Sequence, residues 1–358
     1  MDYDVIYIQK YYHVVIAFFL IVLFLLFLSH FKKENKGNYG LDFVILIFSV
    51  YTIYYFGSRE VRIGVDTIRY QSTFELYKSL SKFVVRKDIF YDYLNYLIGK
   101  FTDFQGLLLI NATLYVAGSW YGLRKIFREN YILPFLVFLI SPYFINNGIN
   151  VMRSGIATSI FIAGIGAYYS KEKTWKWVGL ITTSVLFHFS LFVPLVSFII
   201  TRFFKRTKLI FFLWLTSILL AILDVNIMTR LVNVFDLIAA RSESYVEVSE
   251  EYSSWNNFFI FGFFPVAFGV YNILVLRYKD RFYSWLLNTY MLAHIPYIIL
   301  ISSRFASRLS FLAEFMMPII LMYPLLINPV INIKFYRVKL AVLIFLVFMI
   351  KAYKVLIV

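Results

Sequence analysis

The chain has 358 residues, of which 61% are hydrophobic and 15% charged, with a formal net charge of +15 and no cysteine. A soluble globular chain carries roughly a quarter charged residues, so this composition excludes an ordinary soluble domain and indicates a polytopic membrane protein. The cations stand in short clusters between apolar runs, a pattern of membrane topology rather than of nucleic-acid binding, and the lack of cysteine excludes disulfides, thiol catalysis and cysteine-ligated metal.

Apolar runs recur along the whole chain, and about 20 residues are needed to cross a bilayer. We predict an all-α polytopic integral membrane protein with about twelve transmembrane helices, near residues 11–30, 41–57, 105–122, 131–147, 152–169, 175–187, 189–201, 209–224, 257–276, 283–301, 309–327 and 338–356. The sixth and seventh runs are short and can also be read as one bent hairpin. The first ten residues lack a cationic signal-peptide start, so we expect the first run to be retained. No internal repeat or linker divides residues 1–358, which favours a single integral membrane domain.

Basic clusters at every second boundary between these runs predict the orientation. They are Lys32/Lys33/Lys36, Arg124/Lys125/Arg128, Lys171/Lys173/Lys176, Arg202/Lys205/Arg206/Lys208, Arg277/Lys279/Arg281 and Lys334/Arg337/Lys339. The positive-inside rule places these short loops in the cytoplasm. Both termini and two longer loops, about 58–104 and 225–256, then face outward. The first of these loops is rich in aromatic residues, which predicts amphipathic helices lying on the membrane.

The polar stretch 59–75 opens the first outward loop. Its aromatic residues, spaced four and three apart, share one helical face; they are Tyr70, Phe74 and Tyr77. Asp66-Thr67 is a suitable N-cap for that helix. The free N–H groups of the first turn would then lie beside Arg59 and Arg62, an arrangement suited to phosphate. A solvated amphipathic linker helix on the membrane surface is an equally good interpretation.

Arg153 lies at the outer mouth of the predicted span 152–169, among three asparagines. Small residues follow it at intervals of four and let helices approach closely; they are Gly155, Ser159, Ala163 and Ala167. We therefore expect Arg153 to be held in a packed bundle, and the alternative is a snorkelling interfacial arginine. His188, among aromatic residues on the same outer side, is a candidate general base or phosphate ligand, and a hydrogen-bonded structural histidine is the alternative.

A third candidate region lies late in the chain. Arg304 and Arg308 are one helical turn apart at the outer side, which suits two neighbouring phosphates. Glu314 lies about a turn and a half deeper and is a candidate acid, base or arginine partner, with a structural pairing to His294 or another buried cation as the alternative. The candidates predicted to map to the outer face are Arg59, Arg62, Asp66, Arg69, Arg153, His188, Arg304 and Arg308. An outward basic cavity among lipid-facing helices suits an anionic head group on a lipid tail.

Four short motifs carry a resemblance to a known family. They are Arg62-Ile63-Gly64-Val65-Asp66-Thr67-Ile68-Arg69-Tyr70, then Asn150-Val151-Met152-Arg153-Ser154-Gly155-Ile156-Ala157, then His188-Phe189-Ser190, and the stretch 304–318. In this order, and with this layout of spans, the sequence resembles the EpsG/Wzy-like family of bacterial polysaccharide polymerases. Ser154 departs from the family pattern, which often has Gln after the arginine.

The resemblance implies a GT-C-like glycosyltransferase in the bacterial inner membrane, with its active site facing the periplasm or exterior. It would move a growing chain from undecaprenyl diphosphate to a lipid-linked repeat unit, so both its donor and its acceptor are undecaprenyl-diphosphate-linked oligosaccharides. The arginines and Tyr70 would bind substrate, and the charge developing on the diphosphate would be stabilised by the arginines. The proton acceptor is left open among Asp66, His188 and Glu314. The resemblance implies no metal and no other cofactor, and a chain-length regulator is a further candidate partner.

Other classes compete with this interpretation. A flippase for the same lipid-linked oligosaccharide should show repeat symmetry and charges through the depth of the bundle, and neither is evident. An O-antigen ligase has similar chemistry and a different acceptor, so the sequence separates it poorly from a polymerase. An acyltransferase is disfavoured because no companion motif accompanies His188.

Overall fold

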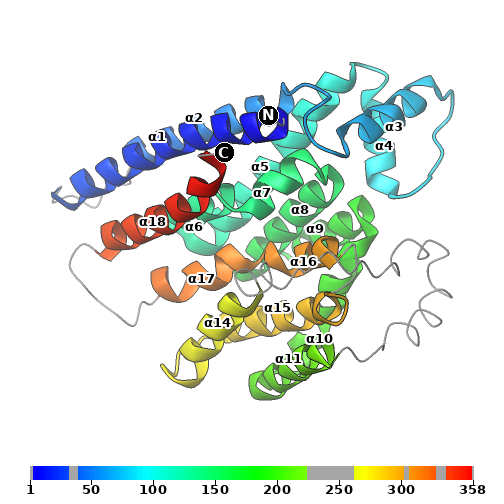
Figure 1. The fold of residues 1–358 in the computed structure, drawn as a ribbon. Helices are drawn as coiled ribbons and strands as arrows, with labels where there is room; N and C mark the ends of the chain where they lie inside the picture. Colours follow the sequence, from blue (N-terminus) through cyan, green and yellow to red (C-terminus); the bar gives the residue numbers. More distant parts are fainter. Residues whose placement is uncertain (1–2, 32–38, 224–261, 302–305, 328–335, 357–358) are drawn as a thin grey trace. The chain divides into compact units, whose positions relative to one another are not determined.

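The computed structural model describes residues 3–31, 39–223, 262–301, 306–327 and 336–356, and every regular element in them is helical (Figure 1). The chain divides into two compact units. Unit 1 comprises Met1–Phe189 and Ile331–Val358, and unit 2 comprises Ser190–Val330. The expectation of a single integral membrane domain stays a prediction, as does the orientation of the chain.

The helices of unit 1 are α1 Tyr3–Phe31, α2 Tyr39–Gly57, α3 Thr67–Ser79, α4 Ile89–Ile98, α5 Phe104–Phe127, α6 Ile132–Leu139, α7 Pro142–Ile149, α8 Met152–Tyr169, α9 Thr174–Phe187 and α18 Tyr336–Leu356. Those of unit 2 are α10 Phe192–Phe203, α11 Thr207–Ile222, α14 Phe264–Leu274, α15 Arg281–Ile299, α16 Ala306–Glu314 and α17 Met317–Leu326. Two short 3₁₀ turns, Arg128–Asn130 and Phe189–Leu191, complete the assignment.

Each apolar run found in the sequence coincides with a helix or a pair of short helices in the described residues. Among the residues that the structure describes, four segments can cross a membrane by length and composition: Asp4–Leu28, Tyr39–Gly57, Phe104–Asn130 and Arg308–Leu326. A bent pair, Ile132–Leu139 with Tyr143–Ile149, makes a fifth if it counts as one span. The all-helical membrane protein is thus confirmed. The count of twelve spans and the GT-C-like arrangement stay predictions, and the loop 225–256 lies outside the described residues.

The centre of unit 1 is the contact between α5 and α8, where two backbones meet. A Cβ atom added to Gly122 would lie 2.3 Å from the carbonyl oxygen of Ile162, and one added to Gly166 would lie 2.6 Å from that of Gly122. Glycine permits this approach because any side chain would strike backbone. The small-residue face predicted for α8 is buried along its length. This tight pair gives α8 a fixed position, and Arg153 is its second residue.

The helices α1, α2 and α18 pack together in the same unit (Figure 1). Aromatic rings fill the contact between α1 and α2, where Tyr7 and Tyr55 stack with centroids 4.4 Å apart and each hydroxyl donates to the other's carbonyl oxygen. Tyr12 meets Phe348 of α18 edge-on at 5.3 Å. Both ends of the chain are therefore built into unit 1.

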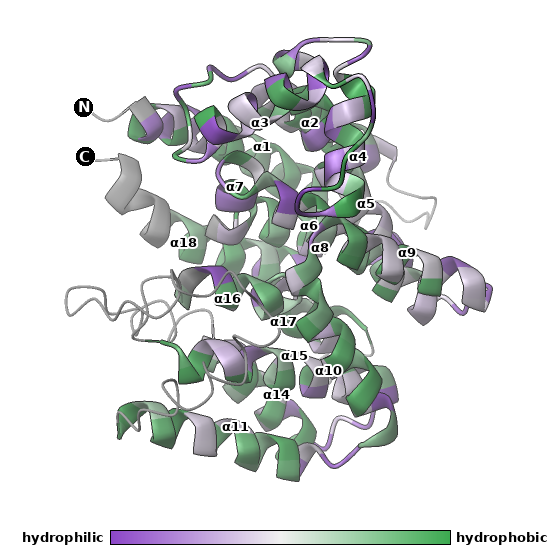
Figure 2. Ribbon diagram, turned by 90° about the vertical axis from the view of Figure 1, so that its right-hand side faces the viewer, coloured by the Kyte–Doolittle hydropathy of each residue, from purple (hydrophilic) through white to green (hydrophobic). Residues whose placement is uncertain are grey.

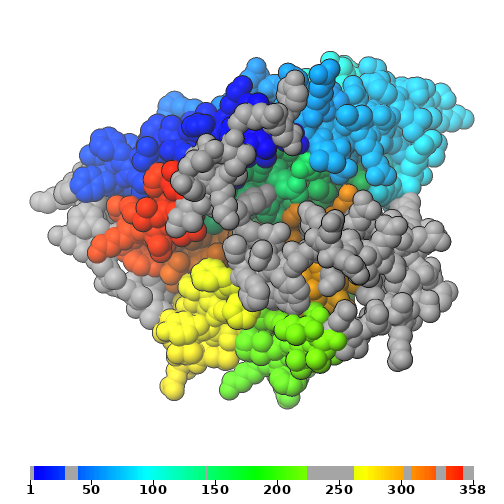
Figure 3. All heavy atoms as spheres, viewed as in Figure 1, coloured from blue at the N-terminus to red at the C-terminus, as the bar shows by residue number. Residues whose placement is uncertain are grey.

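The loop 58–104, which is predicted to face outward, contains helices as expected, α3 and α4. Hydrophilic residues gather around them in Figure 2, and residues 60–100, light blue in Figure 3, form part of the surface of unit 1. The predicted aromatic face of α3 is confirmed, because Tyr70, Phe74 and Tyr77 are all buried. This face holds α3 and α4 against the bundle, so their polar residues have fixed neighbours.

In unit 2, α15 is the central helix and packs against α10, α11 and α16. Its His294 is fully buried, and the indole Nε1–H of Trp214 donates to His294 Nδ1 at 3.4 Å. Thr201 and Thr289 join α10 to α15 through a hydroxyl hydrogen bond of 2.8 Å.

Candidate functional site

A carboxylate, Asp88, joins three helices at one end of unit 1. It precedes α4, and its side chain is 4% exposed. Its Oδ2 accepts a hydrogen bond of 2.6 Å from Nη1 of Arg153, the second residue of α8. The same oxygen lies 3.6 Å from Nδ1 of His188, which ends α9, and Oδ1 accepts the backbone N–H of Phe189 at 3.2 Å. The structure thus brings Arg153 and His188 together around one acid.

The guanidinium of Arg153 also lies against two tyrosine rings. Its central carbon is 5.8 Å from the ring centroid of Tyr70 on α3 and 6.0 Å from that of Tyr91 on α4. Such contacts attract a cation to the ring face. The Arg153 side chain keeps 20% of its surface exposed, as does that of His188. The expectation that Arg153 sits in a packed bundle is confirmed, and the site remains open to solvent on one side.

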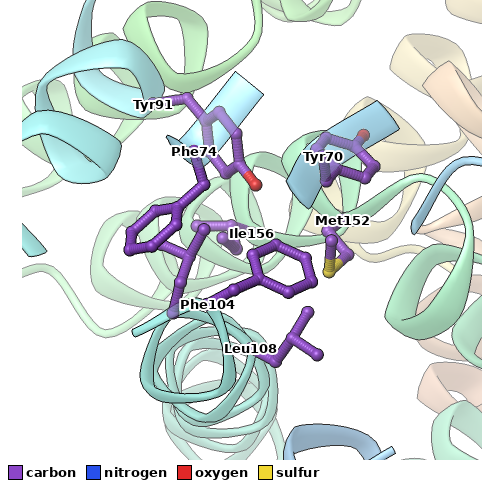
Figure 4. Close-up of a cluster of buried hydrophobic side chains, with 8 residues drawn as sticks. Tyr70, Phe74, Tyr91, Phe104, Leu108, Met152 and Ile156 are labelled. Atoms are coloured by element: carbon purple, nitrogen blue, oxygen red, sulfur yellow. The ribbon is translucent and has the colours of Figure 1, made fainter. Parts of the chain in front are cut away.

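An apolar cluster forms the floor under this site. Tyr70 of α3 and Tyr91 of α4 meet residues of α5 and α8 there (Figure 4); the other members are Phe74, Phe104, Leu107, Leu108, Met152 and Ile156. The rings of Tyr70 and Tyr91 contact edge to face at 5.9 Å, and Asn111 of α5 donates to the Tyr91 hydroxyl at 3.2 Å. The walls that face Arg153 are therefore positioned by buried packing.

The electrostatics around Asp88 keep it ionised. Burial raises the pKa of the Asp88 carboxyl, but the His188 ring and the Arg153 guanidinium outweigh burial and hold that pKa below its usual range. Two donors of the cluster have no hydrogen-bond partner among the described residues, Arg153 Nε and His188 Nδ1. Buried donors are nearly always satisfied, so these two mark a place where an acceptor is missing or must move closer.

Arg59, the first arginine of the polar stretch, has a different environment. It is 3% exposed, and it donates from Nη1 to the carbonyl oxygen of Phe56 at 2.5 Å and from Nη2 to that of Ile149 at 3.0 Å. Nη2 also contacts Sδ of Met152 at 3.0 Å. Both carbonyls belong to the last turn of a helix, α2 and α7, where cations are favourable. Burial lowers the pKa of Arg59 to about 10, which leaves it charged at neutral pH.

The model of the EpsG family matches residues 43–358. The chain belongs to the EpsG family. No curated protein and no solved structure matches it. Membership confirms the resemblance seen in the motifs and points to a polysaccharide polymerase-like function in a membrane.

The first motif of this EpsG chain shapes a turn. Gly64 has φ +92°, and a Cβ there would lie 2.7 Å from Cγ2 of Ile149 and 2.9 Å from Oδ1 of Asn150. Thr67 is buried and donates its hydroxyl to the carbonyl oxygen of Ile63 at 2.7 Å. The Val65 N–H donates to Asn150 Oδ1 at 2.9 Å. The motif therefore docks α3 on the segment that begins α8.

The polar members of that motif lie differently. Arg62 and Arg69 are exposed, and Asp66 is half-buried. Asp66 does occupy the N-cap position of α3, but its side chain makes no capping hydrogen bond. Substrate contacts by these residues, and a catalytic role for Asp66, stay predictions.

The late arginine region belongs to unit 2. Arg304 lies outside the described residues, so its one-turn relation to Arg308 is not seen. Arg308 is exposed on α16, and Glu314 is buried at the end of the same helix. Their proposed roles at the diphosphate and in proton transfer stay predictions.

Asp88 is the site residue that the sequence analysis missed. Its local signal, an acid directly before an aromatic-rich helix, indicates an ordinary N-cap. Its partners lie 65 and about 100 residues further along the chain, so local pattern could not reveal them. In the described part of the chain, no group of three His, Asp or Glu residues is arranged to hold a metal ion.

Proposed function

We propose that this EpsG-family chain polymerises a polysaccharide by glycosyl transfer on the outer face of the inner membrane. The donor is a growing glycan on undecaprenyl diphosphate, and the acceptor is the terminal hydroxyl of a lipid-linked repeat unit. Family membership supports the class of reaction. The geometry around Arg153 supports this region as the site of the reaction.

The observation that carries this proposal is the position of Arg153 at the N-terminus of α8. The free N–H groups of a helix N-terminus already favour an anion, and the N-cap residue Val151 supplies no side-chain cap. Arg153 adds a full positive charge at the same end. The two tyrosine rings and Asp88 hold the guanidinium in place while one side stays open. Such a preorganised cationic site suits the diphosphate leaving group.

The chemistry assigns a part to each group of the cluster. Arg153 stabilises charge that develops on the diphosphate as the bond to the anomeric carbon breaks. A neighbouring base accepts the proton of the acceptor hydroxyl, and the contact of His188 with Asp88, which also binds Arg153, supports His188 as that base. Tyr70 and Tyr91 hold the guanidinium of Arg153 against their ring faces. No step in this scheme requires a metal ion or another cofactor.

Deletion and complementation in the chain's own host test the function. The deletion strain should accumulate single lipid-linked repeat units, and the wild-type chain should restore a ladder of long glycans on a gel. Arg153→Ala should restore none, while Arg281→Ala, an exposed arginine at a predicted cytoplasmic boundary, should behave as wild type. Restored export without elongation would instead indicate a flippase. Long glycans in the deletion strain that fail only to reach their final acceptor would indicate a ligase.

A further inference from the structure

We propose that Asp88 is a positioning residue, which fixes the His188 ring so that its Nε2 accepts the proton of the acceptor hydroxyl, and which holds Arg153 beside it. This inference rests on the proposed polymerase function and names its base and the group that orients that base. It deepens the assignment by choosing one of the three candidate proton acceptors.

The first argument is that Asp88 does not do what its position predicts. An Asp before a helix normally accepts N–H groups of its own first turn, which stabilises the helix. Asp88 has the extended backbone of an N-cap, with φ −124° and ψ 108°, yet its side chain makes no capping hydrogen bond. The carboxylate turns instead to α8 and to the end of α9. A side chain that forgoes its local partner for distant ones is held there by those distant contacts.

The second argument is that the loop before α4 has its own support. Oδ2 of Asp92 accepts the backbone N–H groups of Arg86 at 2.8 Å and Lys87 at 2.7 Å, and Asp92 is 3% exposed. Phe90 of α4 also meets Phe187 of α9 edge-on at 5.8 Å. Loop shape and helix docking therefore have anchors independent of the Asp88 carboxylate, which leaves that carboxylate to act on Arg153 and His188.

The third argument concerns the two nitrogens of His188. Nδ1 is the nitrogen that faces Asp88, at 3.6 Å from Oδ2. A carboxylate facing a ring nitrogen favours the tautomer that carries the proton on that nitrogen. Nε2 then holds a lone pair and can act as the base. At 3.6 Å the two atoms are not hydrogen-bonded in the free protein, and catalytic contacts of this kind often tighten only when substrate binds.

Asp88 itself is poorly suited to be the base. Both its oxygens already accept a hydrogen bond, Oδ1 from the Phe189 N–H and Oδ2 from Nη1 of Arg153. Its neighbours also hold its pKa below the usual range, which weakens it as a proton acceptor. The geometry is that of an acid–histidine pair in which the acid orients and the histidine reacts.

The hydroxyl proton of the acceptor sugar passes to Nε2 of His188 as the hydroxyl oxygen forms a bond to the anomeric carbon of the donor. The bond from that carbon to the diphosphate oxygen breaks, and the diphosphate leaves with the electron pair. Asp88 stabilises the imidazolium that results, and Arg153 stabilises the departing anion.

A double-mutant cycle tests the proposal, with purified protein and the lipid-linked repeat unit that accumulates in the deletion strain. Asp88→Asn and His188→Gln should each lower kcat by about 100- to 10,000-fold, the range of a general base, with less change in KM. The double variant should match the slower single within about 2-fold, because both changes remove one function. Asp92→Asn is the matched control. It should lower thermal stability, and any change that it makes in kcat should multiply with the change made by His188→Gln.

Two results would overturn the proposal. One is an Asp88→Asn kcat near that of wild type, and the other is multiplication of the two single effects in the double variant. If the wild-type protein fails to elongate the repeat unit at all, the proposed function falls instead.

A second measurement is made on the wild-type protein, and a variant serves only to assign its signals. The chain has four histidines, and ¹⁵N-histidine NMR with His188→Gln for assignment reads the protonated ring nitrogen directly. The proposal predicts a neutral ring with the proton on Nδ1 at mildly alkaline pH. A proton on Nε2 would contradict it, whatever the polymerisation assay shows.

Discussion

Arg59 and Arg153 are two partly or fully buried arginines of unit 1 that both lie next to Met152, yet their surroundings are opposite. Arg59 lies at the C-terminal ends of α2 and α7, and its Nη atoms bind carbonyl oxygens there. Arg153 lies at the N-terminal end of α8, where the helix dipole adds to its charge, and its described ionic partner is Asp88. Arg59 is 3% exposed, whereas the Arg153 side chain keeps 20% of its surface open.

This difference indicates that the helix end beside a buried arginine, and its exposure, help to distinguish a structural role from a ligand-binding role. A guanidinium that is buried, and whose charge is compensated by helix C-termini, has few donors available to bind a ligand. A partly exposed guanidinium at a helix N-terminus lies in a positive environment, so it still favours an added anion. We therefore propose that Arg59 belongs to the frame of unit 1 and that Arg153 binds the diphosphate, and each of the following changes tests that division.

Arg153→Ala is expected to have the largest effect. It should lower the polymerisation rate by about 100- to 1,000-fold, the loss typical of removing one charge-stabilising group. It should also lower thermal stability, because the buried Asp88 carboxylate loses its partner. The variant Arg153→Ala/Asp88→Asn should recover most of the stability and none of the rate. Recovery of the rate would show that Arg153 only neutralises Asp88.

Arg59→Met should act mainly on folding. The substitution keeps an unbranched apolar stem and removes the charge-assisted hydrogen bonds to two helix ends, so the unfolding free energy should fall by about 2–4 kcal/mol after partial relief of desolvation. The measurement is chemical denaturation in detergent, with the polymerisation rate normalised to folded protein. A stable variant with a collapsed rate would make Arg59 a substrate ligand, as the sequence analysis expects.

Gly64→Ala should disturb the seam between the first motif and α8. Its positive φ and the 2.7 Å approach to Ile149 leave no room for a methyl group, so a loss of about 1–3 kcal/mol is expected. Gly40→Ala is the control, since nothing lies within 4 Å of a Cβ there. Equal melting temperatures for the two variants would refute the proposed docking role of the motif.

Acid pH should affect the stabilising contacts of the two arginines differently. The partners of Arg59 are carbonyl oxygens and a thioether, which do not titrate, whereas Arg153 depends on Asp88. Because the folded pKa of Asp88 is lowered from 3.8, its contribution to stability is present above that pH and is lost as pH falls through the lower folded value. Asp88→Asn should therefore show a smaller loss of melting temperature on acidification. Parallel curves for wild type and variant would contradict this.

Arg62→Ala and Arg69→Ala should have the smallest effect on folding. Both side chains are exposed, so the unfolding free energy should change by no more than about 0.5 kcal/mol. If they bind substrate, KM rises while stability holds, which the same assay measures. A large loss of stability in either would show that the exposed arginines belong to the frame with Arg59.

The helices and their buried faces could be predicted from the sequence, because both follow from the local periodicity of its residues. The apolar runs mark helices in every described part of the chain, the spacing of Tyr70, Phe74 and Tyr77 predicts the buried face of α3, and small residues predict that of α8. Arg153 and His188 stand out because ionisable groups near spans are costly. Their proximity to one another is a structural finding.

The rest depends on contacts between distant segments. Asp88 has the local pattern of a helix cap, and only the structure shows Arg153 and His188 beside it. Arg59 has the pattern of a phosphate ligand, and only the structure shows that Ile149, 90 residues later, accepts its hydrogen bond. In both cases the residue type suits two roles, and the contacts that bear on the choice come from distant segments.

The most direct test of this division is a paired measurement on Arg59→Lys and Arg153→Lys, which keep the charge and lose the forked donor geometry. Thermal unfolding and the rate of elongation per folded molecule are measured on the same preparations. The account predicts that Arg59→Lys unfolds at lower temperature and elongates at nearly the wild-type rate, while Arg153→Lys keeps its stability and loses most of its rate. The reverse pattern, with a stable inactive Arg59→Lys and an unstable active Arg153→Lys, would contradict it.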